Sequence, residues 1–392
     1  MIKSWKELSL REKIGQVVML QTIPEDHIKK CGSIENFIKT YPIGGLYATG
    51  ELDNGVMLEI EDCKQVFQQY QAYSKTPLLV ANDMEFGSNL DGLVLFPRQI
   101  ALGATYDLDL AYDFGRALAM EAKDCGINWL FSPVVDMPIY PLVLTDTRSV
   151  SDDPKQTVEI AKKIMEGMQA EGVMPCIKHF PAGGLEKVDS HLVRYQPDCT
   201  KEFWDQTCGY VYQELIDYGA PAVMSAHFAL PCYQSEQERS EDGAYEICTL
   251  SKELTTDLLK TKMGFKGVVV TDALVMGGFA GKSAMENMVK SFAAGTDMLL
   301  WPKVEVIDEI EKRILSGDIP MERLEDAVSR VWELKEKLGL FADEKPQEEP
   351  VSKEFLLDVS KRIAEGCLTL VRNESGRIPF GREKIHNVLV VS

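Results

Sequence analysis

Eight short apolar runs alternate with amphipathic stretches of helix length, and this alternation constrains the possible folds more than any other feature of the sequence. Short apolar runs of this kind are typical of buried strands. Strands that alternate strictly with helices favour a parallel sheet. Eight such units over 392 residues predict an α/β fold, a (β/α)8 TIM-type barrel, rather than an open doubly wound sheet. The expected strands cover residues 14–20, 43–48, 78–81, 127–131, 173–177, 222–224, 268–270 and 298–301.

The last part of the chain differs from this repeating pattern. Residues 320–341 carry apolar side chains at helical spacing, which predicts a closing helix that ends near Gly339. Residues 342–352 are polar and contain two prolines, as a linker would. A helix pattern follows at 353–364, and a β-branched run at 388–391. We therefore expect a catalytic barrel at 1–341, a linker at 342–352, and at 353–392 a fragment of a second α/β domain, because one strand cannot form a sheet.

The charge balance excludes some partners. The chain carries 42 basic and 61 acidic residues, a net charge of −19, which argues against nucleic acid or an anionic membrane as a partner. The amino terminus lacks the apolar core of a signal peptide, and no apolar run is as long as a membrane helix. These features predict a cytoplasmic protein.

Cofactor signals are missing from the sequence. The nine cysteines are scattered and form no Cys-x-x-Cys pair, so they predict free thiols rather than a zinc site or a disulfide framework. No Gly-x-Gly-x-x-Gly follows the first expected strand, and no Walker loop is present. We therefore expect neither a metal nor a nucleotide cofactor.

Polar residues follow the expected strands at one end only. In a barrel, chemistry gathers at the carboxyl ends of the strands. Any one of these residues could cap a helix or form a salt bridge, but their recurrence across five strands predicts a site. They are Asp83 and Glu85, Asp136 with Arg148 beyond it, Lys178 and His179, His227, and Asp272.

A glycine-rich loop follows the fifth strand. It places Asp189 two positions before His191, close enough for the carboxylate to fix the tautomer of the imidazole and to raise its basicity. The alternative is that the Asp-Ser-His trio caps the next helix. A regular strand would point Lys178 and His179 to opposite sides, so we predict that the strand is distorted before Pro181.

Several short motifs follow one another along the chain. They include Glu12-Lys13-Ile14-Gly15-Gln16, Ser132-Pro133-Val134-Val135-Asp136, Arg148-Ser149, Lys178-His179-Phe180-Pro181, Asp189-Ser190-His191, Met224-Ser225-Ala226-His227, Val270-Thr271-Asp272-Ala273 and Ala294-Gly295-Thr296-Asp297. With these motifs in this order, the sequence resembles glycoside hydrolase family 3, and within it the β-N-acetylglucosaminidase-like branch. The tail from Glu354 resembles the family's entry into its second, α/β-sandwich domain.

The resemblance implies a role for each candidate residue. Asp272 would be the nucleophile that forms a covalent glycosyl-enzyme, so that the product keeps its configuration. His191, with Asp189 beside it, would be the acid and base. The resemblance implies no metal and no organic cofactor. The residues that would hold sugar hydroxyl groups are Asp83, Arg148, Lys178 and His179.

Two departures from the family pattern affect sugar recognition. The family usually has Gly-His-Gly after Phe-Pro, where this chain has Ala182-Gly183-Gly184. The family also has an arginine eight positions past the first aspartate of its Asp-x-Glu motif, where this chain has Asp91. The second change removes a sugar-binding cation unless Arg98 compensates for it.

Three functional hypotheses follow. The first is a retaining hydrolase that removes terminal β-linked N-acetylglucosamine, or a related β-glycoside, from a small glycan such as a peptidoglycan fragment. The second is a β-N-acetylglucosaminide phosphorylase or a β-glucosidase-like relative, since phosphate could replace water when the base is a neutral imidazole. The third is a catalytically degenerate barrel that binds sugar. A partner or a further segment could complete the second domain in each case.

Overall fold

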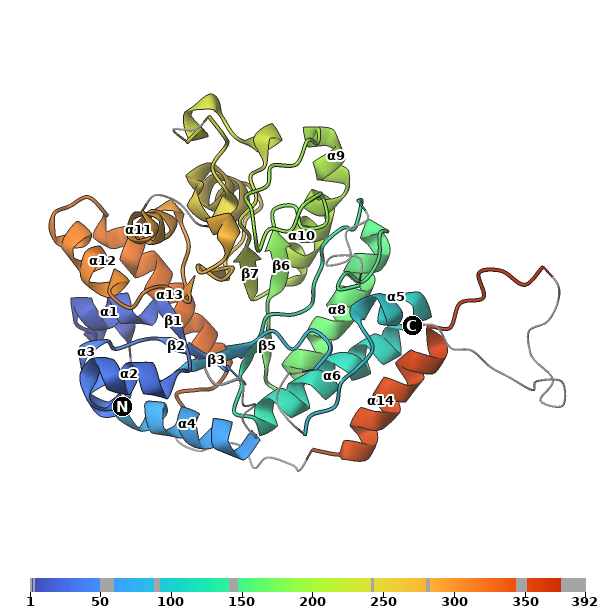
Figure 1. Cartoon of the computed structure of the whole chain (residues 1–392), viewed down its shortest axis with the longest axis horizontal. Coiled ribbons are helices and arrows are strands. Elements are labelled where there is room, and N and C mark those ends of the chain that lie inside the picture. The colour runs from blue at the N-terminus through green and yellow to red at the C-terminus, as the bar shows by residue number, and fades with distance from the viewer. Residues whose placement is uncertain are drawn as a thin grey trace.

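The computed structural model of the chain describes residues 2, 4–49, 60–87, 92–140, 147–240, 243–279, 283–342 and 351–374. Its centre is a curled parallel sheet surrounded by helices (Figure 1). The recorded strand pairings are all parallel, as the alternation of strands and helices predicted. The strands are β1 Val18–Gln21, β2 Gly45–Tyr47, β3 Leu79–Asn82, β4 Trp129–Leu130, β5 Met174–Pro175, β6 Ile177–Phe180, β7 Ala222–Ser225, β8 Val268–Thr271 and β9 Leu299–Leu300.

The strand order runs around a ring. One part of the sheet has the order β5-β4-β3-β2-β1-β9, and the other has the order β6-β7-β8. β5 and β6 lie in one stretch of chain and together fill a single strand position. A bridge between Val270 and Met298 joins β8 to the segment that enters β9. The predicted (β/α)8 barrel is thereby confirmed.

The first expected strand was partly wrong. Residues 14–16 lie in helix α1, Leu10–Gln16, and β1 begins only at Val18. The Ser9 side chain accepts a hydrogen bond from Glu12 N, and the Glu12 carboxylate accepts one from Ser9 N. This capping box starts a helix, and Ile14 is buried on its inner face rather than in the sheet.

Helices cover the outside of the sheet (Figure 1). The long helices α6 and α8 pack against each other and start at Asp107 and Asp153, whose carboxylates cap them. The helices that follow α1 are α2 Pro24–Cys31, α3 Ile34–Thr40, α4 Ile60–Tyr73, α5 Gln99–Thr105, α6 Leu108–Asp124, α8 Pro154–Ala170, α9 Lys201–Gln206, α10 Cys208–Tyr218, the π-helix η5 Glu253–Lys262, α11 Ala284–Ala294, α12 Val306–Leu315, α13 Met321–Lys337 and α14 Lys353–Gly366.

The final helix, α14, packs against α5 and α6 on the outside of the barrel. Leu356, Val359 and Ile363 are buried in the same apolar cluster as residues of α6. Arg362 forms an ion pair with Asp113 of α6 at 2.5 Å. The assignment of 353–392 to a second domain stays a prediction. Most of the expected linker, and the β-branched run at 388–391, lie outside the described residues.

Among the described helices, none has both the length and the apolar character that crossing a bilayer requires.

Candidate active site

Buried ion pairs join the ends of β3 and β6. Lys178 is 1% exposed, and its Nζ contacts Asp83 and lies 2.7 Å from Glu85 Oε1. Burial alone would lower the pKa of Lys178, but the carboxylates of Asp83 and Glu85 raise it above its ordinary value. Burial alone would raise the pKa of Glu85, but Lys178 and Arg148 hold it far below its ordinary value. Lys178, Arg148 and Glu85 are therefore charged at neutral pH.

Asp83 presents its carboxylate to solvent. Its side chain is 47% exposed, although Oδ1 contacts Lys178 and Oδ2 accepts a hydrogen bond from the Tyr47 hydroxyl at 2.6 Å. Tyr47 stands at the end of β2, and its ring packs edge-on against Trp301 with the centroids 4.9 Å apart. A partner bound in the site could thus reach a carboxylate that two neighbours hold in place.

His179 lies in the same cluster and has a defined tautomer. Its Nδ1 lies 2.8 Å from Asp136 Oδ2, and its backbone N–H donates to Asp136 Oδ1 at 2.6 Å. Because a carboxylate accepts, Nδ1 carries the proton and Nε2 faces Arg148 Nη2 at 3.4 Å. The pairing of β6 with β7 shifts register between Ile177 and Phe180, so the predicted distortion is confirmed. The distortion lets both Lys178 and His179 face the site.

Asp272 follows β8 at the same end of the barrel. Its backbone N–H donates to Ser225 O at 2.8 Å, and its Oδ1 accepts from Ala273 N at 2.8 Å. Burial would raise the pKa of this carboxyl, but the imidazoles of His179 and His227 and the Ala273 N–H lower it below its ordinary value. Asp272 is therefore a carboxylate anion beside the cluster.

His227 supports the segment that carries Asp272. It is fully buried, with Nε2 3.1 Å from Ala273 O and Nδ1 2.9 Å from Thr249 Oγ1. Only a protonated Nε2 can bond to a carbonyl oxygen, so the ring fixes the backbone directly after Asp272. Burial lowers the pKa of His227 below its ordinary value.

Asp189 and His191 pair with each other above this cluster. The Nδ1 of His191 lies 2.7 Å from Asp189 Oδ1, which also accepts from the His191 backbone N–H at 2.9 Å. Their side chains are 38% and 48% exposed. Between residues 181 and 200, all of which are described, no helix begins, so the helix-cap alternative is wrong. Gly277 N donates to His191 O at 2.7 Å and holds the loop against the segment after Asp272.

The structure therefore brings Asp83, Arg148, Lys178, His179 and Asp272 to one end of the barrel and lays the Asp189–His191 pair over the segment after Asp272. Sequence reasoning noticed Glu85, Asp136 and His227 at strand ends but gave them no role in the site. It missed Tyr47 and Trp301 altogether, although both aromatic rings lie at the ends of expected strands. Their positions at the carboxyl ends of expected strands could have identified them, because side chains at these ends surround the site of a barrel.

Of the two departures from the family pattern, the structure describes the residues of the first, Ala182-Gly183-Gly184, but not Asp91 of the second. A β-carbon at Gly183 would lie 1.8 Å from Asp136 Oδ1, so the backbone here packs directly onto the carboxylate that holds His179. The guanidinium carbon of Arg98 lies 3.9 Å from the centroid of the Phe86 ring, which follows Glu85 in the chain.

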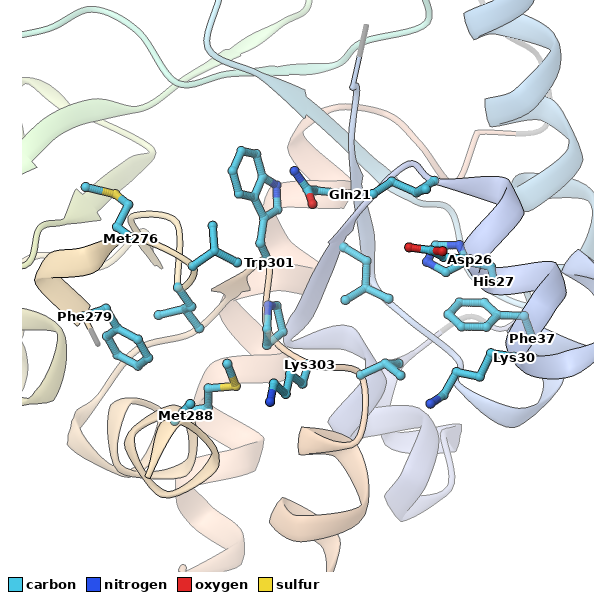
Figure 2. Close-up of a pocket in the computed structure, with 17 residues that line it drawn as sticks. Gln21, Asp26, His27, Lys30, Phe37, Met276, Phe279, Met288, Trp301 and Lys303 are labelled. Carbon is cyan, nitrogen blue, oxygen red and sulfur yellow. The ribbon is translucent and has the colours of Figure 1, made fainter. Parts of the chain in front are cut away.

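A cavity of about 550 Å³ (Figure 2) is lined by none of Asp83, Arg148, Lys178 and Asp272. Trp301 and Gln21, at the ends of β9 and β1, stand between its two walls. Met276 and Phe279 line one wall, and His27 lines the other. The buried Trp301 indole N–H has no hydrogen-bond partner within the part of the chain that the structure describes. Since Trp301 also touches Tyr47, it connects this cavity to the cluster around Asp83.

Comparisons with known proteins find relatives in one protein family. The model of the glycosyl hydrolase family 3 N-terminal domain matches residues 9–334. A β-N-acetylglucosaminidase/β-glucosidase of Cellulomonas fimi is 31% identical over 400 residues, which cover 98% of this chain and 68% of that protein. A β-hexosaminidase of Chromobacterium violaceum is 32% identical over 251 residues, covering 62% of this chain and 68% of that protein.

Two solved structures have the same fold over nearly the whole chain. A family 3 β-N-acetylglucosaminidase from Paenibacillus sp. str. FPU-7 aligns with a TM-score of 0.81 and 26% identity, covering 94% of this chain and 70% of that one. A β-glucoside phosphorylase bound to 2FGlc aligns with a TM-score of 0.76 and 26% identity, covering 92% of this chain and 64% of that one.

Proposed function

Since the chain belongs to glycosyl hydrolase family 3, we propose that it releases terminal β-linked N-acetylglucosamine, or a related β-glycoside, with retention of configuration. The family and the glycoside hydrolase class predicted from the sequence are confirmed. The chain spans about two thirds of the length of the relatives described above. The substrate and the reaction are therefore the proposal.

The observation that carries the proposal is the state of Asp272. A carboxylate anion held at the end of β8 beside a cluster of cations can attack an anomeric carbon. Its oxygen would form a bond to that carbon while the bond to the leaving oxygen breaks, which gives a glycosyl ester of Asp272. Water then attacks the same carbon from the opposite face, and the product regains the original configuration.

The Asp189–His191 pair supplies the proton transfers in this scheme. Burial would raise the pKa of Asp189, but the backbone N–H and the side chain of His191 lower it, so Asp189 is an anion. It binds Nδ1–H and leaves Nε2 of His191 to give a proton to the leaving oxygen and later to take one from water. The exposed position of the pair supports this exchange.

The charged cluster would bind the sugar. Asp83 offers carboxylate oxygens to hydroxyl donors, while Lys178 and Arg148 offer N–H groups to hydroxyl oxygens. Because both cations are paired with the buried carboxylate of Glu85, they are already fixed before the sugar binds. Such a preorganised site loses little entropy when the substrate binds.

The test is release of nitrophenol from 4-nitrophenyl β-N-acetylglucosaminide. Asp272→Asn is expected to lower kcat/KM by at least about a thousandfold. The matched control is Asp308→Asn, which changes an exposed carboxylate on α12 and is expected to leave kcat/KM unchanged. Full activity in Asp272→Asn would refute the proposed nucleophile.

His191→Ala gives a second, independent test. Nitrophenol is a good leaving group, so the first step needs little acid, and the variant is expected to accumulate the glycosyl-enzyme. Azide, which needs no general base, should then restore turnover and yield a β-glycosyl azide. A variant that azide does not rescue would contradict the role of His191.

A phosphorylase is the second candidate, because a β-glucoside phosphorylase is among the similar structures. An uncharged imidazole base repels an incoming phosphate less than a carboxylate would. In that case added inorganic phosphate would accelerate nitrophenol release and yield a sugar 1-phosphate. No turnover on a panel of β-glycosides, with measurable sugar binding, would leave only a degenerate sugar-binding barrel.

Four further expectations from the sequence stay predictions. They are a cytoplasmic location, a small glycan as substrate, the absence of nucleic-acid and membrane partners, and a partner or segment that completes the second domain.

A further inference from the structure

Two half-buried thiols meet at the base of the loop that carries Asp189 and His191. Cys199 and Cys232 are both free thiols, and their side chains interact with each other. Cys199 lies eight positions after His191 and shortly before α9, while Cys232 lies in the 3-10 turn η2, Pro231–Tyr233, after β7. The pair therefore links the catalytic loop to the neighbouring segment of the barrel.

Contacts on both sides of the pair hold the two segments together. The rings of Trp204 and Tyr233 lie 4.9 Å apart, and the Tyr233 hydroxyl donates to Asp205. On the other side, Tyr195 forms a bridge with Phe228, and Ala229 N donates to Tyr195 O at 3.0 Å. The segments that carry Cys199 and Cys232 are thus held together by contacts that do not involve sulfur.

We propose that Cys199 and Cys232 are a redox modification site, at which a peroxide converts the two thiols into a reversible disulfide that fastens the base of the Asp189–His191 loop. The disulfide does not depend on the function proposed above. In a reducing compartment such disulfides are transient and sense oxidants.

The chemistry balances with one peroxide molecule. The thiolate of Cys199 attacks one peroxide oxygen, the O–O bond breaks, and a sulfenic acid and an alcohol, or water from hydrogen peroxide, are formed. The sulfur of Cys232 then attacks the sulfur of the sulfenic acid, and hydroxide leaves as water with the Cys232 proton. Two thiols are oxidised by two electrons in total, and the peroxide accepts them.

The arrangement of the pair assigns the two roles. The interaction between the two thiols lowers the pKa of Cys199 below and raises that of Cys232 above the ordinary thiol value. The group with the larger thiolate fraction reacts with peroxide first. Cys199 is therefore the attacking residue and Cys232 the resolving one.

The test compares the full chain before and after mild treatment with hydrogen peroxide. Peptide mapping without reductant is expected to give a linked Cys199–Cys232 peptide, lighter than the two thiol peptides by two hydrogen atoms, and dithiothreitol should reverse the change. The bridge closes a long loop of the unfolded chain, so Tm is expected to rise by about 5 °C.

Matched variants make the test specific. Cys199→Ser and Cys232→Ser should each abolish the linked peptide and the shift in Tm, while Cys31→Ser, at a half-buried thiol in α2, should keep both. In Cys232→Ser, peroxide should trap Cys199 as a sulfenic acid that reacts with dimedone. The inference is overturned if Cys31 or Cys367 is oxidised while no Cys199–Cys232 peptide forms, or if the Tm rise persists in Cys232→Ser.

Discussion

Arg148 holds Glu85 through two parallel hydrogen bonds, 2.9 Å from Nε to Oε2 and 2.6 Å from Nη2 to Oε1. The carboxylate is almost fully buried, and Lys178 shares it. Such a forked pair fixes the orientation of the guanidinium as well as its position. The two cations of the cluster therefore share one carboxylate to which the sequence analysis gave no role in the site.

We predict that Glu85→Gln lowers the free energy of unfolding by about 3–5 kcal/mol, because it leaves buried cations without their anion. Urea unfolding at pH 7 measures the change. Glu35→Gln breaks an exposed pair with Lys39 and should cost at most about 1 kcal/mol. An equal loss of unfolding free energy in the two variants would show that the buried ion pairs of Glu85 stabilise the fold no more than an exposed ion pair does.

Gly183→Ala is expected to reduce both activity and stability. The new β-carbon would collide with Asp136 Oδ1, and the carboxylate would have to leave His179. Overpacking of this kind costs about 1–3 kcal/mol. Steady-state assays should show kcat/KM reduced by at least about tenfold, since positioning groups act on catalysis through orientation.

The control for this change is Gly172→Ala. Gly172 has φ of +78° but nothing within 4 Å of its would-be β-carbon, so the variant pays only the strain of the left-handed backbone. It should unfold more readily than the wild type and keep its kcat/KM. If Gly183→Ala behaves in the same way, the contact with Asp136 does not matter for catalysis.

Glu186→Gln should stabilise the protein above neutral pH. Burial, followed by the charge of Asp136, raises the pKa of Glu186 to about 7. Between the ordinary glutamate value and pH 7, the folded state binds more protons than the unfolded state, so the wild type loses stability as pH rises. The variant avoids this loss, and its advantage should grow to about 3 kcal/mol at pH 8.

Denaturant unfolding at several pH values between 4 and 8 measures this advantage. Glu202→Gln at the start of α9 changes an exposed carboxylate and should show no such trend. An advantage of Glu186→Gln that is constant across the range would contradict a raised pKa.

Lys335→Met should also stabilise the protein, with the opposite dependence on pH. Burial lowers the pKa of Lys335 to about 7, and its recorded acceptor is the uncharged amide oxygen of Gln16 at 2.7 Å. Between pH 7 and the ordinary lysine value, the unfolded state binds more protons, so the wild type gains stability as pH rises. At pH 7 the variant should be more stable by about 1–4 kcal/mol.

This advantage should shrink as the pH approaches 10, which unfolding curves recorded at pH 7 and pH 9.5 can compare. Lys337→Met changes an exposed lysine on the same helix and serves as the control. A loss of stability in Lys335→Met at pH 7 would mean that the hydrogen bond to Gln16 outweighs the cost of burying the amine.

The fold was largely predictable because strands and helices leave different periods in the sequence. Residues 14–16 show the limit of that signal, since apolar residues on a short buried helix look like the start of a strand. The Ser9 and Glu12 capping box was the local feature that distinguished the two. The break between β5 and β6 depends on pairing with different neighbours, which no local pattern encodes.

The position of Asp272 after a strand and the pairing of Asp189 with His191 were predictable, because each depends on residues close together in the sequence. Contacts between distant segments were not. Arg148 and Glu85, which form two hydrogen bonds, lie 63 positions apart in the sequence. Tyr47 contacts Trp301 only because β1 and β9 pair and close the barrel. The roles of these residues stay predictions until the variants are measured.

The burial of Leu356, Val359 and Ile363 against the barrel bears on where the protein can be divided. A chain cut at residue 341, where the sequence analysis expected the barrel to end, would expose an apolar surface along α5 and α6 to solvent. Exposed apolar surfaces of this kind promote aggregation. Helix α14, through Gly366, therefore completes the apolar packing of α5 and α6.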